Sequence, residues 1–202
     1  MITISDNSKT RIGEVMTEIR WHSRAGQGAV TGAKGLGSVV ATTGKEVQAY
    51  ALYGSAKRGA AMNAYNRIDD EPITNHETKM YPDYVFVIDP ALAFTDDITK
   101  NDKPDTQYII TTHMSKEDLI AEIPALQDKV DRTYVVDCMQ ISLDTIGRAM
   151  PNTPILGAFM KVSKMYELDF FLDNMKKVLA KFPQKIIDAN MDAITRAYNE
   201  VK

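Results

Sequence analysis

The chain has 202 residues, of which 44% are hydrophobic and 25% are charged, and its formal net charge at pH 7 is −3. This length allows one domain with a buried core, and the charge balance gives no electrostatic reason to expect a nucleic-acid partner. No run of about 18 apolar residues predicts a membrane span, and the N-terminus lacks the pattern of a secretory signal. We expect a cytoplasmic protein.

Cys138 is the only cysteine, so this chain alone cannot form an internal disulfide or hold a zinc or iron–sulfur cluster through several thiolates. The three histidines, His22, His76 and His113, show no metal-ligand spacing. We therefore predict no metal site. Cys138 follows an apolar strand, and we interpret it as a small buried residue rather than a nucleophile.

Residues 1–16 look like a polar N-terminal arm, and we assign residues 17–202 to a single α/β domain. A strand is predicted over 17–21 and a helix over 29–42, ended by Gly44 as a left-handed cap. That helix contains Gly32, Gly35 and Gly37. Each weakens a helix by about 1 kcal/mol relative to alanine, a cost that is tolerated where a helix must approach another backbone closely.

The central part alternates between strand-like and helix-like segments. Strands are predicted over 46–52, 59–68, 84–88, 106–112 and 133–138, and helices over 115–123 and 139–150. Ser115 and a glutamate near the third helical position match a capping box. The order predicts a mostly parallel, Rossmann-like sheet flanked by helices. Three further helices, over 153–166, 168–182 and 183–201, form a helical C-terminal extension at about 154–200.

A polar loop follows the first strand and holds Arg24, Gly26, Gln27 and Gly28. Its glycines free the backbone to turn, and the helix that follows adds about half a positive charge at its start. The loop is neither a dinucleotide-binding G-x-G-x-x-G motif nor a P-loop. Two interpretations stay open: an anion-binding turn, or a tight turn that packs against neighbouring chain.

A second, cationic loop joins the strands at 46–52 and 59–68. Its candidate binding residues are Tyr53, Gly54, Ser55, Lys57 and Arg58. A sheet that is parallel at its centre would bring both loops to the carboxyl ends of the strands, where open α/β sheets bind ligands. Asp89 ends a strand on the same rim, and we expect it to cap the next helix. The alternative for the second loop is a surface turn with two solvated cations.

Four blocks of sequence, in this order, carry a resemblance to a known family: EIRWHSRAGQGAVTGAKGLG, VQAYALYGSAKRGAAMNAYNRIDDEPI, PDYVFVIDPAL and PNTPILGAFMK. They resemble the gamma subunit of 2-oxoacid:acceptor oxidoreductases of the pyruvate:ferredoxin type, from about Thr17 to the C-terminal helices. The family pattern G-R-G-G-Q-G is here Ser23-Arg24-Ala25-Gly26-Gln27-Gly28, with two glycines replaced. The second family pattern, Y-G-x-E/A-x-R-G, is matched by Tyr53, Gly54, Arg58 and Gly59.

The resemblance implies a complex that decarboxylates a 2-oxoacid to an acyl-coenzyme A. It implies thiamine diphosphate with Mg, [4Fe–4S] clusters and coenzyme A as cofactors, alpha, beta and delta subunits as partners, and ferredoxin or an NAD-linked flavin subunit as acceptor. The gamma chain would hold no cofactor and catalyse nothing alone. Arg24, Gln27, Lys57 and Arg58 would then border the coenzyme A path or a subunit contact.

Two other functions stay open from the sequence: a freestanding nucleotide-binding domain and a purely structural scaffold subunit. The sequence of this chain does not indicate which 2-oxoacid is the substrate, whether pyruvate, 2-oxoglutarate or phenylglyoxylate. The eleven methionines are mostly spaced as core residues. The alternative for Met160, Met165 and Met175 is that they face a partner subunit, because methionine adapts to irregular gaps.

Overall fold

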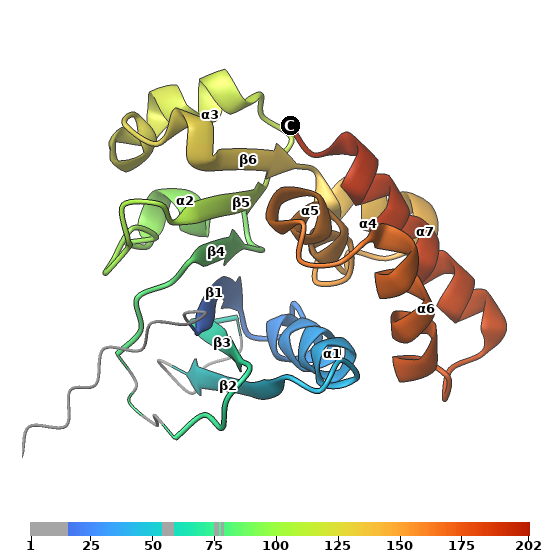
Figure 1. Ribbon diagram of the computed structural model, residues 1–202. Coiled ribbons are helices and arrows are strands. Elements are labelled where there is room, and N and C mark those ends of the chain that lie inside the picture. The colour runs from blue at the N-terminus through green and yellow to red at the C-terminus, as the bar shows by residue number, and fades with distance from the viewer. Residues whose placement is uncertain (1–15, 54–58, 75–76, 78) are drawn as a thin grey trace, which may run out of the picture.

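The structure is a computed structural model that describes residues 16–53, 59–74, 77 and 79–202. The predicted N-terminal arm, apart from Met16, lies outside the described residues, and so do Gly54, Ser55, Lys57 and Arg58 of the second loop. The rest forms a twisted sheet between two layers of helices (Figure 1).

The sheet has six strands in the order β2-β3-β1-β4-β5-β6. Their bounds are β1 Thr17–Arg24, β2 Glu46–Tyr53, β3 Ala61–Asp69, β4 Tyr84–Val87, β5 Gln107–Thr111 and β6 Thr133–Val136. The pairs β1–β4, β4–β5 and β5–β6 are parallel, as predicted, whereas β3 runs antiparallel to both β1 and β2. Strands β2 and β3 form a hairpin because the short stretch between them cannot make the crossover that parallel strands need.

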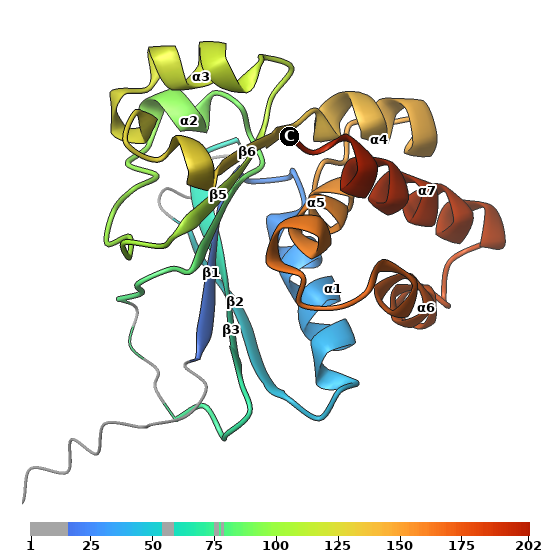
Figure 2. The same cartoon turned by 45° about the horizontal axis from the view of Figure 1, so that its top comes forward.

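Seven α-helices surround the sheet in the described part of the chain. They are α1 Ala29–Ala41, α2 Leu92–Thr95, α3 Lys116–Glu122, α4 Cys138–Ile146, α5 Pro154–Ser163, α6 Leu168–Val178 and α7 Gln184–Glu200, with 3₁₀ turns at Pro124–Leu126 and Val130–Arg132. Figure 2 shows α1 and α4–α7 on one face and α2 and α3 on the other, beside β4–β6. The C-terminal helices therefore complete a layer of the domain, and the larger hydrophobic core lies between them, α1 and the sheet.

Several element boundaries differ from the sequence-based prediction. Strand β1 continues to Arg24, because it stays paired with β3 along its whole length. Helix α4 ends at Ile146, where Gly147 takes a left-handed φ of 80°, rather than at residue 150. Ser115 caps α3 as predicted, but its partner is Asp118, whose backbone N–H donates to the serine hydroxyl over 3.1 Å. The short helix α2 was not predicted, since four residues show no helical periodicity.

Close approach explains two of the three glycines in α1. A Cβ on Gly32 would lie 2.9 Å from Cζ3 of Trp21, and one on Gly37 would lie 2.9 Å from Cγ1 of Val47. Gly35 has ordinary space, with Cε of Met175 at 3.7 Å. An even closer contact joins α5 to α7, because a Cβ on Gly157 would overlap the carbonyl oxygen of Ile194. Glycine thus sets the distance between the helical layer and its neighbours.

A buried polar bridge fixes α1 to the sheet. The indole Nε1 of Trp21 donates to Oδ1 of Asn66 over 2.9 Å, and Nδ2 of Asn66 donates to the carbonyl of Ala33 over 2.9 Å. Both Trp21 and Asn66 are fully buried. A carboxamide can accept and donate at once, so this one side chain satisfies a strand residue and the helix backbone together.

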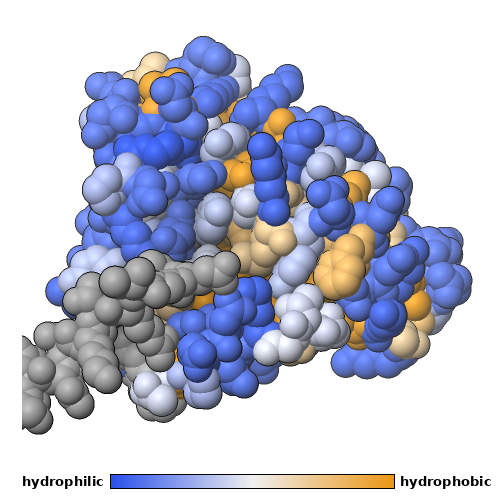
Figure 3. Space-filling model, in the orientation of Figure 1, coloured by the Kyte–Doolittle hydropathy of each residue, from blue (hydrophilic) through white to orange (hydrophobic). Residues whose placement is uncertain are grey.

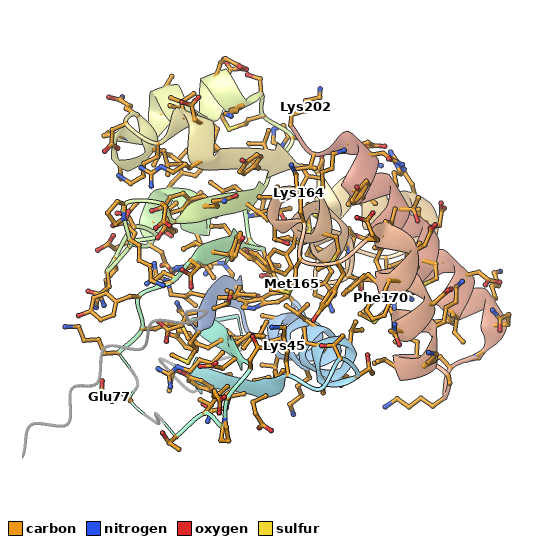
Figure 4. The ribbon with its side chains drawn as sticks, viewed as in Figure 1. Lys45, Glu77, Lys164, Met165, Phe170 and Lys202 are labelled. Atoms are coloured by element: carbon orange, nitrogen blue, oxygen red, sulfur yellow. The ribbon has the colours of Figure 1, made fainter. Side chains whose placement is uncertain are left out.

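The alternative of partner-facing methionines is wrong for two of its three residues. Met160 and Met175 are 1% and 3% exposed and belong to the core, because they lie on the faces of α5 and α6 that turn inward. Met165 is half-buried at the turn between these helices, near the exposed ring of Phe170 (Figure 4). In Figure 3 apolar surface gathers in the middle of the same face of the molecule.

Candidate functional site

The first loop and the described end of the second lie side by side at one edge of the sheet. Arg24, the last residue of β1, pairs with Ala61, the first of β3. Beyond that pair, the N–H of Ala25 donates to the carbonyl of Ala60 over 3.0 Å. Nη1 of Arg24 donates to the carbonyl of Gly59 over 3.3 Å. The predicted rim at the carboxyl end of β1 therefore exists, and Tyr53, which ends β2, reaches it through its backbone pairing with Met62.

The side chain of Gln27 forms hydrogen bonds to three residues in and around the first loop. Its Oε1 accepts the backbone N–H of Arg24 over 2.8 Å and the hydroxyl of Ser23 over 3.2 Å. Its Nε2 donates to Oδ2 of Asp89 over 2.5 Å. One side chain thus closes the turn on itself and ties it to the end of β4. This explains why glutamine follows the glycine here, since both ends of the amide are used.

Arg24 is paired rather than free. Its Nε lies 3.3 Å from Oδ2 of Asp89, and the arginine and aspartate side chains are 37% and 13% exposed. Oδ1 of Asp89 accepts the N–H of Ala91 over 3.0 Å, in the turn before α2. The expectation that Asp89 caps this helix is wrong, because the N-cap of α2 is Ala91 and it has no side-chain cap. The paired carboxylate offsets the arginine charge, and an anion at this rim would interact with the backbone dipoles more than with Arg24.

Positive φ angles fall on the glycines that remain in the loop. Gly26 has φ 103° and Gly28 has φ 86°. Ser23 and Ala25, which stand where the family pattern has glycine, are not among the positive-φ residues. Their side chains are therefore compatible with the turn. Gly28 serves as the N-cap of α1, which has no side-chain cap and no acidic residue in its first turn. The first N–H groups of α1 thus lack the usual side-chain acceptor.

Asn152 lies beside the rim; it belongs to the block PNTPILGAFMK that carries the family resemblance, but it was not among the predicted site residues. A Cβ on Gly28 would lie 2.8 Å from Cγ of Asn152, and one on Gly32 would lie 3.0 Å from its carbonyl oxygen. The absence of side chains at Gly28 and Gly32 therefore lets the turn that enters α5 pack closely against the start of α1. Asn152 is 3% exposed, and its Oδ1 has no hydrogen-bond partner among the described residues. An orphaned buried acceptor costs about 1–3 kcal/mol, so it marks a place where a donor belongs.

Other reactive groups do not contribute to the rim. Burial raises the pKa of the Cys138 thiol to about 12, against the opposing effect of the nearby Thr111 hydroxyl. The thiol is therefore protonated at neutral pH and inert as a nucleophile. Within residues that the structure describes, no group of three His, Cys, Asp or Glu side chains is placed to hold a metal ion. A search of the same residues finds no helix long and apolar enough to cross a membrane.

The sheet and its glycine-bearing rim define an open α/β protein, and the carboxyl ends of the strands are the edge where proteins of this class bind ligands. Residues 18–200 match the family model described as pyruvate ferredoxin/flavodoxin oxidoreductase. Pyruvate synthase subunit PorC of Thermotoga maritima is 39% identical over 186 residues, which are 92% of this chain and 94% of that protein. The pyruvate/ketoisovalerate oxidoreductases common subunit gamma of Thermococcus kodakarensis is 38% identical, over 92% of this chain and 97% of that one.

Solved structures agree with these matches. The crystal structure of the Thermotoga maritima subunit superposes with a TM-score of 0.79 at 36% identity, over 94% of this chain and 98% of that one. A 2-oxoglutarate:ferredoxin oxidoreductase of Magnetococcus marinus, with 2-oxoglutarate, coenzyme A and succinyl-CoA bound, shares the fold. Its TM-score is 0.71 at 13% identity, over 93% of this chain and 31% of that one. The chain belongs to the pyruvate ferredoxin/flavodoxin oxidoreductase family, as a chain of its gamma-subunit type.

Proposed function

We propose that this chain is the gamma subunit of a cytoplasmic complex that oxidatively decarboxylates a 2-oxoacid, and that its rim forms part of the path for coenzyme A. Support for the complex comes from relatives that are named as subunits and that match over nearly their whole length. Support for the rim comes from one observation: the orphaned acceptor of Asn152 lies against Gly28, at the uncapped start of α1.

The residues at the rim fit coenzyme A by their chemistry. The start of α1 offers backbone N–H groups and a positive dipole end, which suit a phosphate. The Asn152 amide offers an acceptor for a ligand N–H or O–H. Gly28 lets that amide pack directly against the start of α1, because a side chain at residue 28 would overlap it. Lys57 and Arg58, outside the described residues, belong to the loop that continues into Gly59 and would add positive charge.

Each described residue then has a definite task in this proposal. Gln27 and Asp89 hold the loop in one conformation through the 2.5 Å contact between Nε2 and Oδ2, which spares the ligand the cost of ordering it. Asn152 orients the ligand. Coenzyme A, when bound, supplies the thiol that accepts the acyl group; this chain supplies binding and orientation.

The remaining cofactors belong on other chains. A single cysteine cannot hold a four-iron cluster, and the described residues show no acidic cluster for a magnesium ion that would carry thiamine diphosphate. We assign thiamine diphosphate, Mg and the [4Fe–4S] clusters to alpha, beta and delta subunits. Ferredoxin or an NAD-linked flavin subunit is the proposed acceptor. Pyruvate is the first substrate to test, because the T. maritima relative is named for it.

The test replaces Asn152 with alanine in the assembled complex. We expect the KM for coenzyme A to rise by about tenfold, the effect of roughly 1.4 kcal/mol of lost binding, while the KM for the 2-oxoacid stays unchanged. Asn174→Ala is the matched control, because Asn174 is equally buried on α6 and makes its hydrogen bond to Phe170 within that helix. Arg58→Ala tests the second loop in the same assay.

Hydrogen exchange gives a readout that does not need turnover. Coenzyme A added to the complex should protect backbone amides around residues 24–30, and Asn152→Ala should abolish that protection. Neither protection nor an effect on KM in an intact complex would leave the rim as a subunit contact, which is the scaffold alternative. A chain that purifies alone and binds nucleotide by itself would support the freestanding-domain alternative.

A further inference from the structure

A second concave site lies on the sheet, apart from the rim. A pocket of about 640 Å³ covers the face of β1 and β3 that points away from α1. Arg20 and His22 of β1 and Tyr65 of β3 form its floor, and the segment 96–101 that follows α2 forms one wall. Figure 2 shows that, among the described residues, α2 and α3 lie beside β4–β6 on this side and no helix covers β1–β3. Neither Gln27 nor Asn152 lines the pocket.

Arg20 places a buried positive charge on this floor. The side chain is buried, with 5% of the residue exposed. Nη1 donates to the carbonyl of Lys100 over 2.6 Å, Nη2 donates to the carbonyl of Ile98 over 2.7 Å, and Nε donates to Nε2 of His22 over 3.1 Å. All three acceptors are neutral. A guanidinium has five N–H donors, so two more remain for a ligand.

His22 does not change this balance, because it is held neutral. Its Nε2 accepts from Arg20, which leaves the proton on Nδ1, 3.0 Å from Oδ2 of Asp96. Burial also lowers the pKa of His22. Asp96 is thus engaged by the imidazole. In the described part of the chain, no carboxylate forms an ion pair with Arg20. Asp97 and Asp102 are the carboxylates whose charges act on Arg20, and neither contacts it as an ion pair.

Two further cations stand at the mouth of the pocket. Lys79 and Lys100 are exposed, and neither forms an ion pair with a carboxylate of the described residues. Two carboxylates, Asp96 and Asp97, also line the pocket. Asp97 accepts a hydrogen bond from the Thr99 hydroxyl over 3.1 Å. Among the lining residues three cations stand beside two carboxylates, and Asp102 and Glu77, which do not line the pocket, act on Arg20 and Lys79. A planar guanidinium with free donors matches a carboxylate best.

We propose that this pocket binds a carboxylate, with Arg20 as its charged floor and Lys79 and Lys100 at its mouth. Its volume is in the range of small-ligand sites, about 300–1,000 Å³. A free acid and an acidic side chain of a neighbouring subunit carry the same group. The site is separate from the coenzyme A path and does not depend on it.

The first experiment titrates the isotope-labelled full-length chain with acetate, and with acetamide as the neutral isostere, at constant ionic strength. Acetate should produce saturable NMR shifts at His22 and Tyr65, and acetamide should not. Lys79→Met with Lys100→Met should weaken acetate binding at least threefold, and Arg20→Met should abolish it. Lys176→Met with Lys177→Met, on the exposed face of α6, is the matched control. The lysine variants keep the test valid if Arg20→Met fails to fold.

The second experiment measures the dissociation constant between the same variants and the rest of the complex. Saturable acetate shifts in the isolated chain support a free acid as the occupant. Absence of those shifts, together with an assembly constant at least tenfold weaker in the pocket variants than in the control, supports a partner carboxylate. The proposal is overturned if acetate and acetamide act alike and the pocket variants assemble as well as the control.

Discussion

The side chain of Asn152 lies directly against Gly28, with its Cγ 2.8 Å from the place where a Cβ of residue 28 would stand. The two residues are far apart in the sequence: Gly28 is the N-cap of α1, and Asn152 lies in the turn before α5. Their contact is possible only because Gly28 has no side chain and adopts φ 86°. The candidate rim therefore depends on a glycine for both its backbone conformation and its packing.

Gly28→Ala tests this contact. The left-handed conformation alone costs an alanine about 1–2 kcal/mol, and the steric overlap with Asn152 adds to that. Gly44→Ala is the control, because Gly44 has φ 83° and nothing within 4 Å of its Cβ position. Urea unfolding should give a larger loss for Gly28→Ala, and the KM for coenzyme A should change in that variant alone. Equal losses in the free energy of unfolding of both variants would mean that the contact between Gly28 and Asn152 does not contribute to stability.

Gly157→Ala should destabilise the protein strongly. Its Cβ would overlap the carbonyl oxygen of Ile194, so α5 and α7 would have to separate and lose part of the buried core between them. We expect a loss of about 3 kcal/mol or more in the free energy of unfolding. Gly35→Ala should act in the opposite direction, by about 1 kcal/mol, since its surroundings leave room and alanine favours helix. Thermal and urea denaturation measure both.

Asn66→Leu should remove the bridge between α1 and the sheet. It leaves Nε1 of Trp21 without an acceptor, whereas the carbonyl of Ala33 keeps its partner within α1. One orphaned buried donor costs about 1–3 kcal/mol, and we expect a loss of about 2 kcal/mol. Combining Asn66→Leu with Trp21→Phe removes one orphan, so the double variant should lose less than the sum of the two single variants. Strict additivity in urea denaturation would contradict the bridge.

Stability should fall below about pH 6.5 because of His22. Burial lowers the pKa of His22 in the folded state, so below the unfolded value of about 6.5 the unfolded chain binds a proton that the folded chain does not. The free energy of unfolding then falls by up to about 1.4 kcal/mol per pH unit until the folded pKa is reached. His22→Gln should flatten this slope between pH 8 and 5. His113→Gln, at an exposed position, should leave it unchanged.

The sequence by itself determined the order of the strands and longer helices and the place of the polar loop at Arg24–Gly28. Apolar runs such as 84–88 and the helical spacing after Gly28 are local patterns, and local backbone preferences translate them directly into elements. The loop at Arg24–Gly28 was predicted in the same way, because a turn that needs positive φ angles requires glycines, and these are visible in the sequence. The resemblance to gamma subunits gave the family before any contact was known.

Only the tertiary structure decided what those elements meet. The direction of β3, the contact of Asn152 with Gly28 and the bond from Gln27 to Asp89 join residues that are distant in the chain. Arg20 looked like an ordinary strand residue until the fold placed it at the floor of a pocket. The physical reason is that side-chain partners across a fold are chosen by packing and by the need to satisfy buried polar groups. Neither leaves a local pattern in the sequence.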